Sequence, residues 1–142
     1  MSAQEDVRAA SDQFYVALNN MVNGDARPMA DIWSHADTVT TMHPIGGRQV
    51  GWADVKASWS GVADLSTRGS AALTDQQIRV MGDVAYEVGV EHVDMTLADD
   101  RFQGEVRVTN IYHRKQGEWR LIHHHSDTSP AMQDLLRRAQ AA

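Results

Sequence analysis

Cysteine is absent from the 142-residue sequence, and this absence removes several classes of chemistry. Without cysteine there is no disulfide, no thiolate nucleophile and no cysteine-ligated zinc site. Long apolar runs are missing too, since no segment approaches the roughly 18 apolar residues of a membrane span. Residues 1–23 carry Glu5, Asp6, Arg8 and Asp12 where a signal peptide would be apolar. We therefore expect a cytoplasmic protein without a membrane partner.

Positive charge is scarce as well, because thirteen Lys and Arg residues face nineteen Asp and Glu residues, a formal net charge of -6. Proteins that bind nucleic acid neutralise phosphates with Lys and Arg, so nucleic acid is a disfavoured partner. The apolar share of 42% and the charged share of 23% are ordinary for a globular protein. We expect one domain over residues 1–142, with a core at about 5–129 and a tail or short helix over 130–142.

The first half of the chain has the apolar period of helices. Apolar residues repeat at threes and fours over 7–22, again over 28–33 and again over 53–62, which predicts three N-terminal helices. The alternating, β-branched segment 38–43 predicts a strand between the second and third helices. Gly46 and Gly47 then predict a turn.

The second half changes to the two-residue period of strands. After a loop over 66–72, we expect strands at 78–81, 84–95, 102–112 and 119–125, joined by short turns into an antiparallel meander. An apolar stripe after Pro130 predicts a short C-terminal helix. The fold class is therefore α+β, with helices on one face of a curved, mainly antiparallel sheet and a pocket between them.

This order of elements and four short motifs resemble a known family. The motifs are Asn23-Gly24-Asp25, Met42 to Gly47, Val50-Gly51-Trp52 and Trp119 to Ser126. They are similar to SnoaL-like, ketosteroid-isomerase-like proteins of the nuclear transport factor two-like superfamily. The resemblance covers roughly residues 5–129 and implies a cone-shaped α+β fold, a deep pocket and a dimer. Because the superfamily includes isomerases, dehydratases, cyclases, hydrolases and binding modules, fold alone does not name a reaction.

The resemblance also implies catalytic positions. Ketosteroid isomerases carry a catalytic aspartate just before a proline at the end of the first strand, and here His43 precedes Pro44. An imidazole with its ordinary pKa of about 6.5 can act as a base at neutral pH. The family's oxyanion-hole acid lies on a later strand, where Asn110 stands and can donate through its amide without a pKa shift. The family's oxyanion-hole tyrosine lies on the first helix, where this chain has Phe14 and Tyr15.

Strand alternation extends this candidate site. Asn110 and Tyr112 share a strand face, so both are expected to face the pocket. On the preceding strand, Tyr86 and His92 share a face with two valines, and an apolar wall with two polar tips suits a small-ligand cavity. Trp52 adds an aromatic wall for an apolar ligand.

Acidic side chains give no catalytic pair by their spacing. Glu87 and Glu91 lie on the opposite strand face from Tyr86 and His92. We interpret them as members of cross-strand charge pairs on a solvated or interfacial face.

Three consecutive histidines form the most conspicuous cluster. Because successive strand side chains point to opposite faces, only His123 and His125 can share a site, and one imidazole is expected inside the pocket. Together with His43, His92 or Asp127, they have the composition of a zinc or iron(II) site. No His-Glu-x-x-His or similar spacing is present, so we expect no metal and no cofactor.

Together these features favour a small-molecule-binding protein that acts as an isomerase or dehydratase on an apolar carbonyl substrate. His43 would move the proton and Asn110 would stabilise the developing oxyanion. The alternative is a non-catalytic, dimeric binding or association domain. Residues 110–115, followed by 117–126, also resemble the association domain of calcium/calmodulin-dependent protein kinase II. Both hypotheses imply a homodimer paired through the convex face of the sheet.

Overall fold

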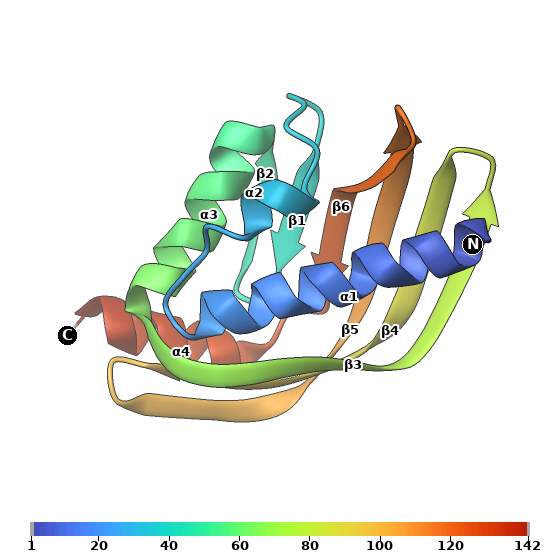
Figure 1. Cartoon of the computed structure of the whole chain (residues 1–142). Coiled ribbons are helices and arrows are strands. Elements are labelled where there is room, and N and C mark those ends of the chain that lie inside the picture. Colours follow the sequence, from blue (N-terminus) through green and yellow to red (C-terminus); the bar gives the residue numbers. More distant parts are fainter. Residues whose placement is uncertain (1, 142) are drawn as a thin grey trace.

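The computed structural model describes residues 2–141 and has an α+β fold built on one six-stranded sheet (Figure 1). The helices are α1 (Ala3–Val22), α2 (Met29–Ile32), α3 (Trp52–Leu65) and α4 (Pro130–Ala141). The strands are β1 (Thr40–His43), β2 (Gly46–Val50), β3 (Ser66–Met81), β4 (Val84–Leu97), β5 (Asp100–Lys115) and β6 (Glu118–Ser126). The α+β class expected from the sequence is confirmed. Within these residues, no helix combines the length and the apolar character needed to cross a membrane.

The sheet is mixed, with the strand order β2-β1-β6-β5-β4-β3. Strands β3 to β6 form the expected antiparallel meander. Strand β1 pairs antiparallel with the edge strand β2 and parallel with β6, so that Thr41 lies opposite His124. The end of β1, which carries His43, therefore lies beside the last strand of the meander.

Three details of the sequence prediction are wrong. Only one long helix and one four-residue helix precede the sheet, since α3 follows β1 and β2. Gly46 and Gly47 begin β2, and the turn falls at residues 44–45. The expected loop at 66–72 is the first part of β3. The small and polar residues of this segment lack the apolar alternation of a strand, and pairing with β4 stabilises it as one.

Helix α1 begins with a capping box and buries one face against the sheet. The Ser2 hydroxyl accepts a hydrogen bond from the Glu5 backbone N–H over 3.1 Å, and the Glu5 carboxylate accepts one from the Ser2 N–H over 3.3 Å. The periodic apolar residues predicted from the sequence line the buried face, among them Val7, Phe14 and Leu18. Tyr15 is buried on the same helix, which places its hydroxyl inside the protein.

Helix α1 also covers the sheet edge formed by β3. The Asn19 side chain donates to the Ala71 carbonyl over 2.7 Å and accepts from the Ala71 N–H over 3.0 Å. One helical turn later, Asn23 makes the same pair of bonds with Gly69, at 3.0 and 3.3 Å. Residues four apart on a helix thus match residues two apart on a strand. The outward backbone groups of Gly69 and Ala71 are satisfied by side chains.

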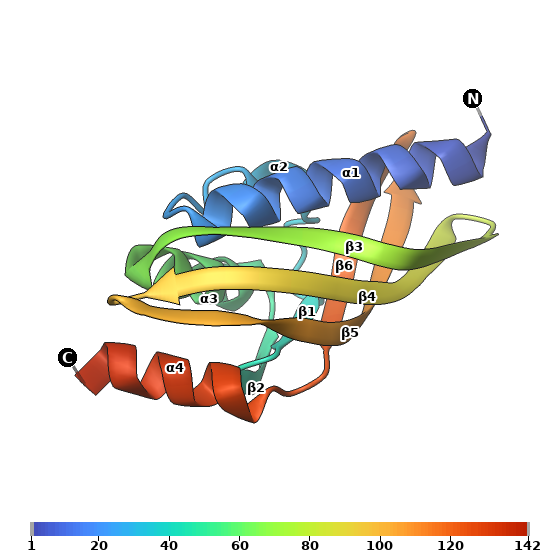
Figure 2. The same cartoon turned by 90° about the horizontal axis from the view of Figure 1, so that it is seen from below.

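Helix α4 lies beside the β4–β5 hairpin (Figure 2). Its buried residues are Met132, Leu135 and Ala139. The Ser129 N–H donates to the Pro44 carbonyl over 2.9 Å, just before the helix starts. Arg138 forms an ion pair with Asp100 at 3.1 Å. Helix α4 therefore covers the end of the sheet where β1 terminates.

Candidate functional site

A small cavity of about 50 Å³ lies between the sheet and helices α1, α3 and α4. Most of its wall is apolar, with Leu18, Trp59 and Met132 among the lining residues. Three titratable side chains also line it, namely His43, Glu91 and His124. An apolar cavity with a few convergent polar groups is the usual form of a small-molecule site.

A row of polar residues crosses the sheet beside this cavity. Thr41, His124, Asn110 and Glu87 lie opposite one another on β1, β6, β5 and β4. Each of the four is at most 2% exposed. The Thr41 hydroxyl makes no hydrogen bond within residues 2–141. Buried polar groups are costly unless they are hydrogen-bonded, so the partners of His124, Asn110 and Glu87 determine how these three side chains are oriented.

The Asn110 amide links the row in a fixed direction. Its Nδ2 donates to Glu87 Oε1 over 2.9 Å and to the Tyr15 hydroxyl over 3.3 Å. Its Oδ1 lies 2.6 Å from His124 Nδ1 and must accept, so the proton of His124 is on Nδ1. His124 Nε2 then accepts from the Ser126 hydroxyl over 3.2 Å. Both amide hydrogens of Asn110 are therefore engaged inside the protein.

Glu91 is the carboxyl group of the cavity wall. The Tyr15 hydroxyl donates to Glu91 Oε2 over 2.8 Å, and Oε1 makes no hydrogen bond with residues 2–141. Burial, helped by the nearby Glu87 and opposed by the Tyr15 hydrogen bond, raises the pKa of Glu91 to about 7. Burial and Glu91 also raise the pKa of Tyr15, which keeps its proton. Glu91 can therefore gain or lose a proton near neutral pH.

His43, the last residue of β1, is part of the cavity wall. Its ring packs edge-on against Trp59, with ring centroids 4.5 Å apart. The Ser58 hydroxyl donates to the Val55 carbonyl over 2.7 Å, so it accepts from His43 Nε2 over 2.8 Å. This leaves Nδ1 as the unprotonated nitrogen. Burial lowers the pKa of His43 to about 4, so the ring is neutral at pH 7.

His124 is also neutral at pH 7. Burial lowers its pKa well below the ordinary value, and the nearby His43, His123 and His125 rings lower it further. The His124 ring lies 5.6 Å from the Trp59 ring, measured between centroids. The cavity therefore holds two uncharged imidazoles and one carboxyl group of intermediate pKa.

On β4, the structure places the predicted residues on the opposite face. Tyr86 is 36% exposed and the His92 side chain is 46% exposed. Glu87 and Glu91 point inward and are buried. The valines beside Tyr86 suggested an apolar inner face, and the donors that accommodate the two carboxyl groups come from distant segments. Sequence alternation alone did not contain this signal.

The histidine cluster is also reversed. His124 is buried in the cavity wall, whereas His123 is half-buried and His125 exposed on the other face. A β-bulge between β5 and β6 causes this, because Ile111 pairs with His123 while Tyr112 pairs with Leu121. The bulge shifts the alternation by one residue after the buried Leu121. Within residues 2–141, no three metal-ligating side chains are grouped to hold a metal ion.

The remaining predicted residues have mixed positions. Tyr15, Asn110 and Tyr112 are buried together, and the Tyr112 hydroxyl donates to Glu87 over 3.1 Å. Asn110 does not line the cavity. Trp52 lies outside it, stacked on His35 at a centroid distance of 4.6 Å. The structure thus brings His43 to the cavity and adds Glu91 and His124, which sequence reasoning missed.

Comparisons with known proteins agree with the fold. A proposed dehydratase of the NTF2-like family from Streptomyces avermitilis is 25% identical over 89% of this chain and 95% of that chain, with a TM-score of 0.78. A proposed calcium/calmodulin-dependent protein kinase type II association domain from Thiobacillus denitrificans is 25% identical over 86% and 94% of the two chains, with a TM-score of 0.66.

A third structure extends the likeness of the fold. A protein with a cystatin-like fold from Caulobacter vibrioides is 18% identical over 94% and 96% of the two chains, with a TM-score of 0.72. No curated protein matches the sequence significantly. A family model for the SnoaL-like domain matches residues 7–132, which include every residue of the cavity wall except Leu136. The chain therefore belongs to the SnoaL-like domain family, within the nuclear transport factor two-like superfamily.

Proposed function

We propose that this protein catalyses proton transfer on a small, mostly apolar carbonyl or hydroxyl compound, as an isomerase or a dehydratase does. One observation carries the proposal. His43, with a pKa of about 4, and Glu91, with a pKa of about 7, line the same apolar cavity. Titratable groups whose pKa values are pushed apart by their surroundings supply the acceptor and the donor of a proton-transfer reaction.

The two groups have separate roles in this mechanism. His43 Nδ1 takes a proton from the carbon next to the substrate carbonyl, and the C–H electron pair becomes the double bond of an enol. Protonated Glu91 gives its proton to the carbonyl oxygen. In an isomerase, His43 then gives its proton to a different carbon of the substrate, and Glu91 takes back the proton on the oxygen. In a dehydratase Glu91 instead protonates a leaving hydroxyl group, which departs as water.

The two groups lie on strands that are not neighbours in the sheet. Strand β1 is separated from β4 by β6 and β5. Three strand spacings of about 4.8 Å place the two backbones roughly 14 Å apart before curvature. The substrate would lie between the two side chains, in contact with the apolar wall. A dehydratase assignment for the 25% identical Streptomyces avermitilis protein is consistent with this chemistry.

The cavity must enlarge to accept such a substrate. At about 50 Å³ it is well below the roughly 300–1,000 Å³ of pockets that hold small-molecule ligands. Met132 and Leu136 of α4 form part of the wall. We propose that these side chains move outward when substrate binds.

Hydrogen exchange on simple ketones tests the proposal without knowledge of the natural substrate. The protein is incubated in D2O with cyclopentanone or cyclohex-2-enone, and NMR follows the loss of the proton next to the carbonyl. We expect exchange above the buffer rate, and His43→Ala should slow it about 100- to 10,000-fold. His35→Ala is the matched control, because His35 is an exposed histidine outside the cavity. Undiminished exchange in folded His43→Ala would overturn the role of His43.

A second candidate function is a dimeric association domain without catalysis. The similarity to the proposed association domain from Thiobacillus denitrificans favours it. So does the outer sheet face, which presents Tyr86 with the half-buried Val88, Val90 and Ile111. The occupant of this face would be a second copy of the chain. Binding of the ketones without any protein-dependent exchange would favour this function over the enzyme.

A further inference from the structure

Glu87 is a fully buried carboxyl group that does not line the cavity. No Lys, Arg or His side chain within residues 2–141 forms a salt bridge with it. Burying a carboxyl group without a cation is costly, and hydrogen-bond donors must compensate for the lost water. Its partners therefore show what it does.

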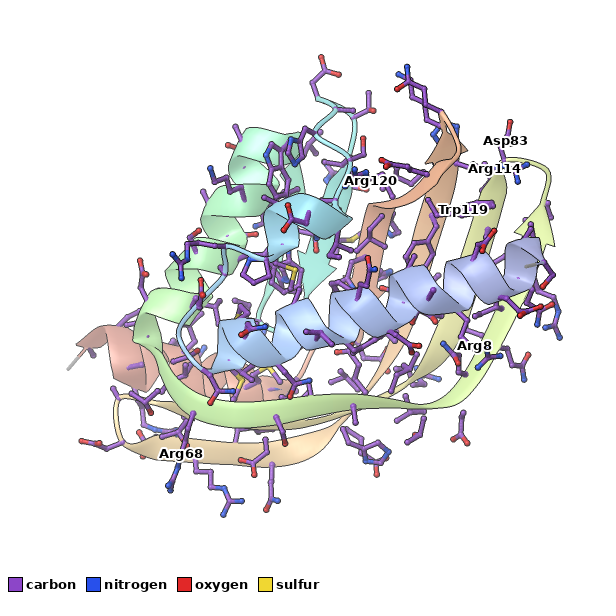
Figure 3. The ribbon with its side chains drawn as sticks, viewed as in Figure 1. Arg8, Arg68, Asp83, Arg114, Trp119 and Arg120 are labelled. Carbon is purple, nitrogen blue, oxygen red and sulfur yellow. The ribbon has the colours of Figure 1, made fainter. Side chains whose placement is uncertain are left out.

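Glu87 accepts three hydrogen bonds from neutral donors. Its Oε1 accepts from Asn110 Nδ2 over 2.9 Å and from the Tyr112 hydroxyl over 3.1 Å. Its Oε2 accepts from Gln76 Nε2 over 2.6 Å. Arg8 donates to Gln76 Oε1 over 2.6 Å, which fixes the orientation of that amide. Arg8 reaches this position from α1 (Figure 3).

An ionised carboxylate can only accept hydrogen bonds, so Glu87 determines which end of the Asn110 amide faces it. The amide nitrogen must face Glu87, and the amide oxygen then faces His124. With that oxygen as its partner, His124 carries its proton on Nδ1. The second amide hydrogen points to the Tyr15 oxygen, so the Tyr15 proton is directed to Glu91.

We propose that Glu87 is a positioning residue, which fixes the His124 tautomer and keeps the Tyr15 hydroxyl as a donor to Glu91. The catalytic consequence rests on the function proposed above, whereas the hydrogen-bond directions do not. Glu91 is faced by Tyr15 from α1, by Glu87 on its own strand, and by His43 and His124 across the cavity. Because the negative charge of Glu87 also acts on Glu91, its removal has an electrostatic effect that must be separated from the directional one.

A pair of variants makes this separation. Glu87→Gln replaces one acceptor oxygen by a donor nitrogen. Either this nitrogen meets the Gln76 nitrogen, or it turns toward Asn110 and reverses that amide. Adding Gln76→Glu gives the new nitrogen an acceptor and places a carboxylate next to Arg8. The double variant keeps the total charge of this group, and Tyr112→Phe is a control that removes one donor to Glu87 but leaves Asn110 in place.

Side-chain nitrogen NMR of His124 reads the tautomer directly. We expect the wild type to have its proton on Nδ1 only, Glu87→Gln to show a second population protonated on Nε2, and the double variant to return to one form. Carboxyl carbon NMR should show the pKa of Glu91 falling in the double variant, where only the charge of Glu87 is lost from beside it, and falling less in Glu87→Gln, where the Tyr15 hydroxyl also turns away from Glu91. The tautomer should be unchanged in Tyr112→Phe.

Two results would overturn the inference. The first is a wild-type protein in which His124 carries its proton on Nε2. The second is a folded Glu87→Gln variant in which the His124 tautomer is unchanged. Ketone exchange gives an independent comparison, since it should slow in Glu87→Gln and recover in part in the double variant. If the tautomers behave as expected while the wild type exchanges no ketone proton, the proposed function fails and the positioning role of Glu87 stands.

Discussion

The hydroxyl of Tyr15 donates a 2.8 Å hydrogen bond to the carboxyl group of Glu91, and so joins the first helix to the middle of the sheet inside the protein. Both residues are buried. A carboxyl group in an apolar wall, held by one directional donor, has a defined position and a pKa near neutrality. This pair is therefore the first point at which the candidate site can be tested.

Tyr15→Phe should raise the pKa of Glu91 above about 7, because the hydroxyl bond is the contact that lowers it. Loss of a buried hydrogen bond should also reduce the free energy of unfolding by about 1–3 kcal/mol. Carboxyl carbon NMR measures the first effect and urea unfolding the second. Tyr112→Phe is the matched control, since the Tyr112 hydroxyl donates to Glu87 instead. A fall in the pKa of Glu91 would contradict this account.

Glu91→Gln should change how stability depends on pH. In the folded protein Glu91 keeps its proton up to about pH 7, whereas in the unfolded chain it ionises near 4.5. The unfolded state therefore binds fewer protons between these values, and wild-type stability falls as pH rises through them. The variant lacks this loss, so its stability relative to wild type should increase by about 3 kcal/mol from pH 4 to pH 7.5. Urea unfolding at both pH values measures the difference, and a constant difference would contradict the prediction.

Ketone exchange should have a bell-shaped pH profile. Below about pH 4, His43 becomes protonated and can no longer accept a proton. Above about pH 7, Glu91 has lost the proton that it donates. We expect kcat/KM to fall on both sides, and Glu91→Gln to lower the maximum and remove the upper limb. An upper limb that persists unchanged in Glu91→Gln would assign it to another group.

The outer face of the sheet predicts the oligomeric state. Tyr86→Lys should convert the proposed dimer to a monomer, because it places a charge within the proposed apolar contact. Val16→Lys is the matched control, since Val16 is an apolar residue of α1 that is 62% exposed and lies away from this face. Sedimentation velocity distinguishes the two states. A monomeric wild-type protein would contradict the proposed dimer.

Leu136→Ala should make the cavity more accessible. Leu136 lines the cavity from α4, so its truncation adds space without changing a titratable group. We expect tighter binding of cyclohex-2-enone, at a cost of about 2–3 kcal/mol in unfolding free energy. Gln140→Ala, on the exposed side of the same helix, should change neither quantity. Equal ketone affinity in Leu136→Ala and wild type would show that this side chain does not limit binding.

The sequence predicts the elements of this protein better than the faces of its strands. The periodicity from Val7 to Val22 and the later alternation have local causes, so α1 and strands β4 to β6 follow from them. The family resemblance also identified the superfamily correctly. Which strand face points inward depends on distant residues, and this is where sequence reasoning fails.

Two positions show the physical reason. Burial of Glu91 is supported by a hydrogen bond from the Tyr15 hydroxyl, 76 residues earlier, and no local sequence pattern indicates that partner. His124 faces inward because one extra residue in β6 shifts the alternation, and bulges have no reliable sequence signal. His43, which lines the cavity, was predicted from its place before Pro44, which matches a family position and does not depend on alternation.

The asparagine pairs at the sheet edge have a consequence for the behaviour of the protein in a crowded solution. An uncovered edge strand is a template on which another chain can add a strand, and such growth leads to aggregates. Asn19 and Asn23 already occupy the backbone groups of Ala71 and Gly69 that a newcomer would need. Beyond them, Asp75 has a φ of 53° beside a break in strand register, which interrupts the flat edge. Loss of both asparagines would leave that template open.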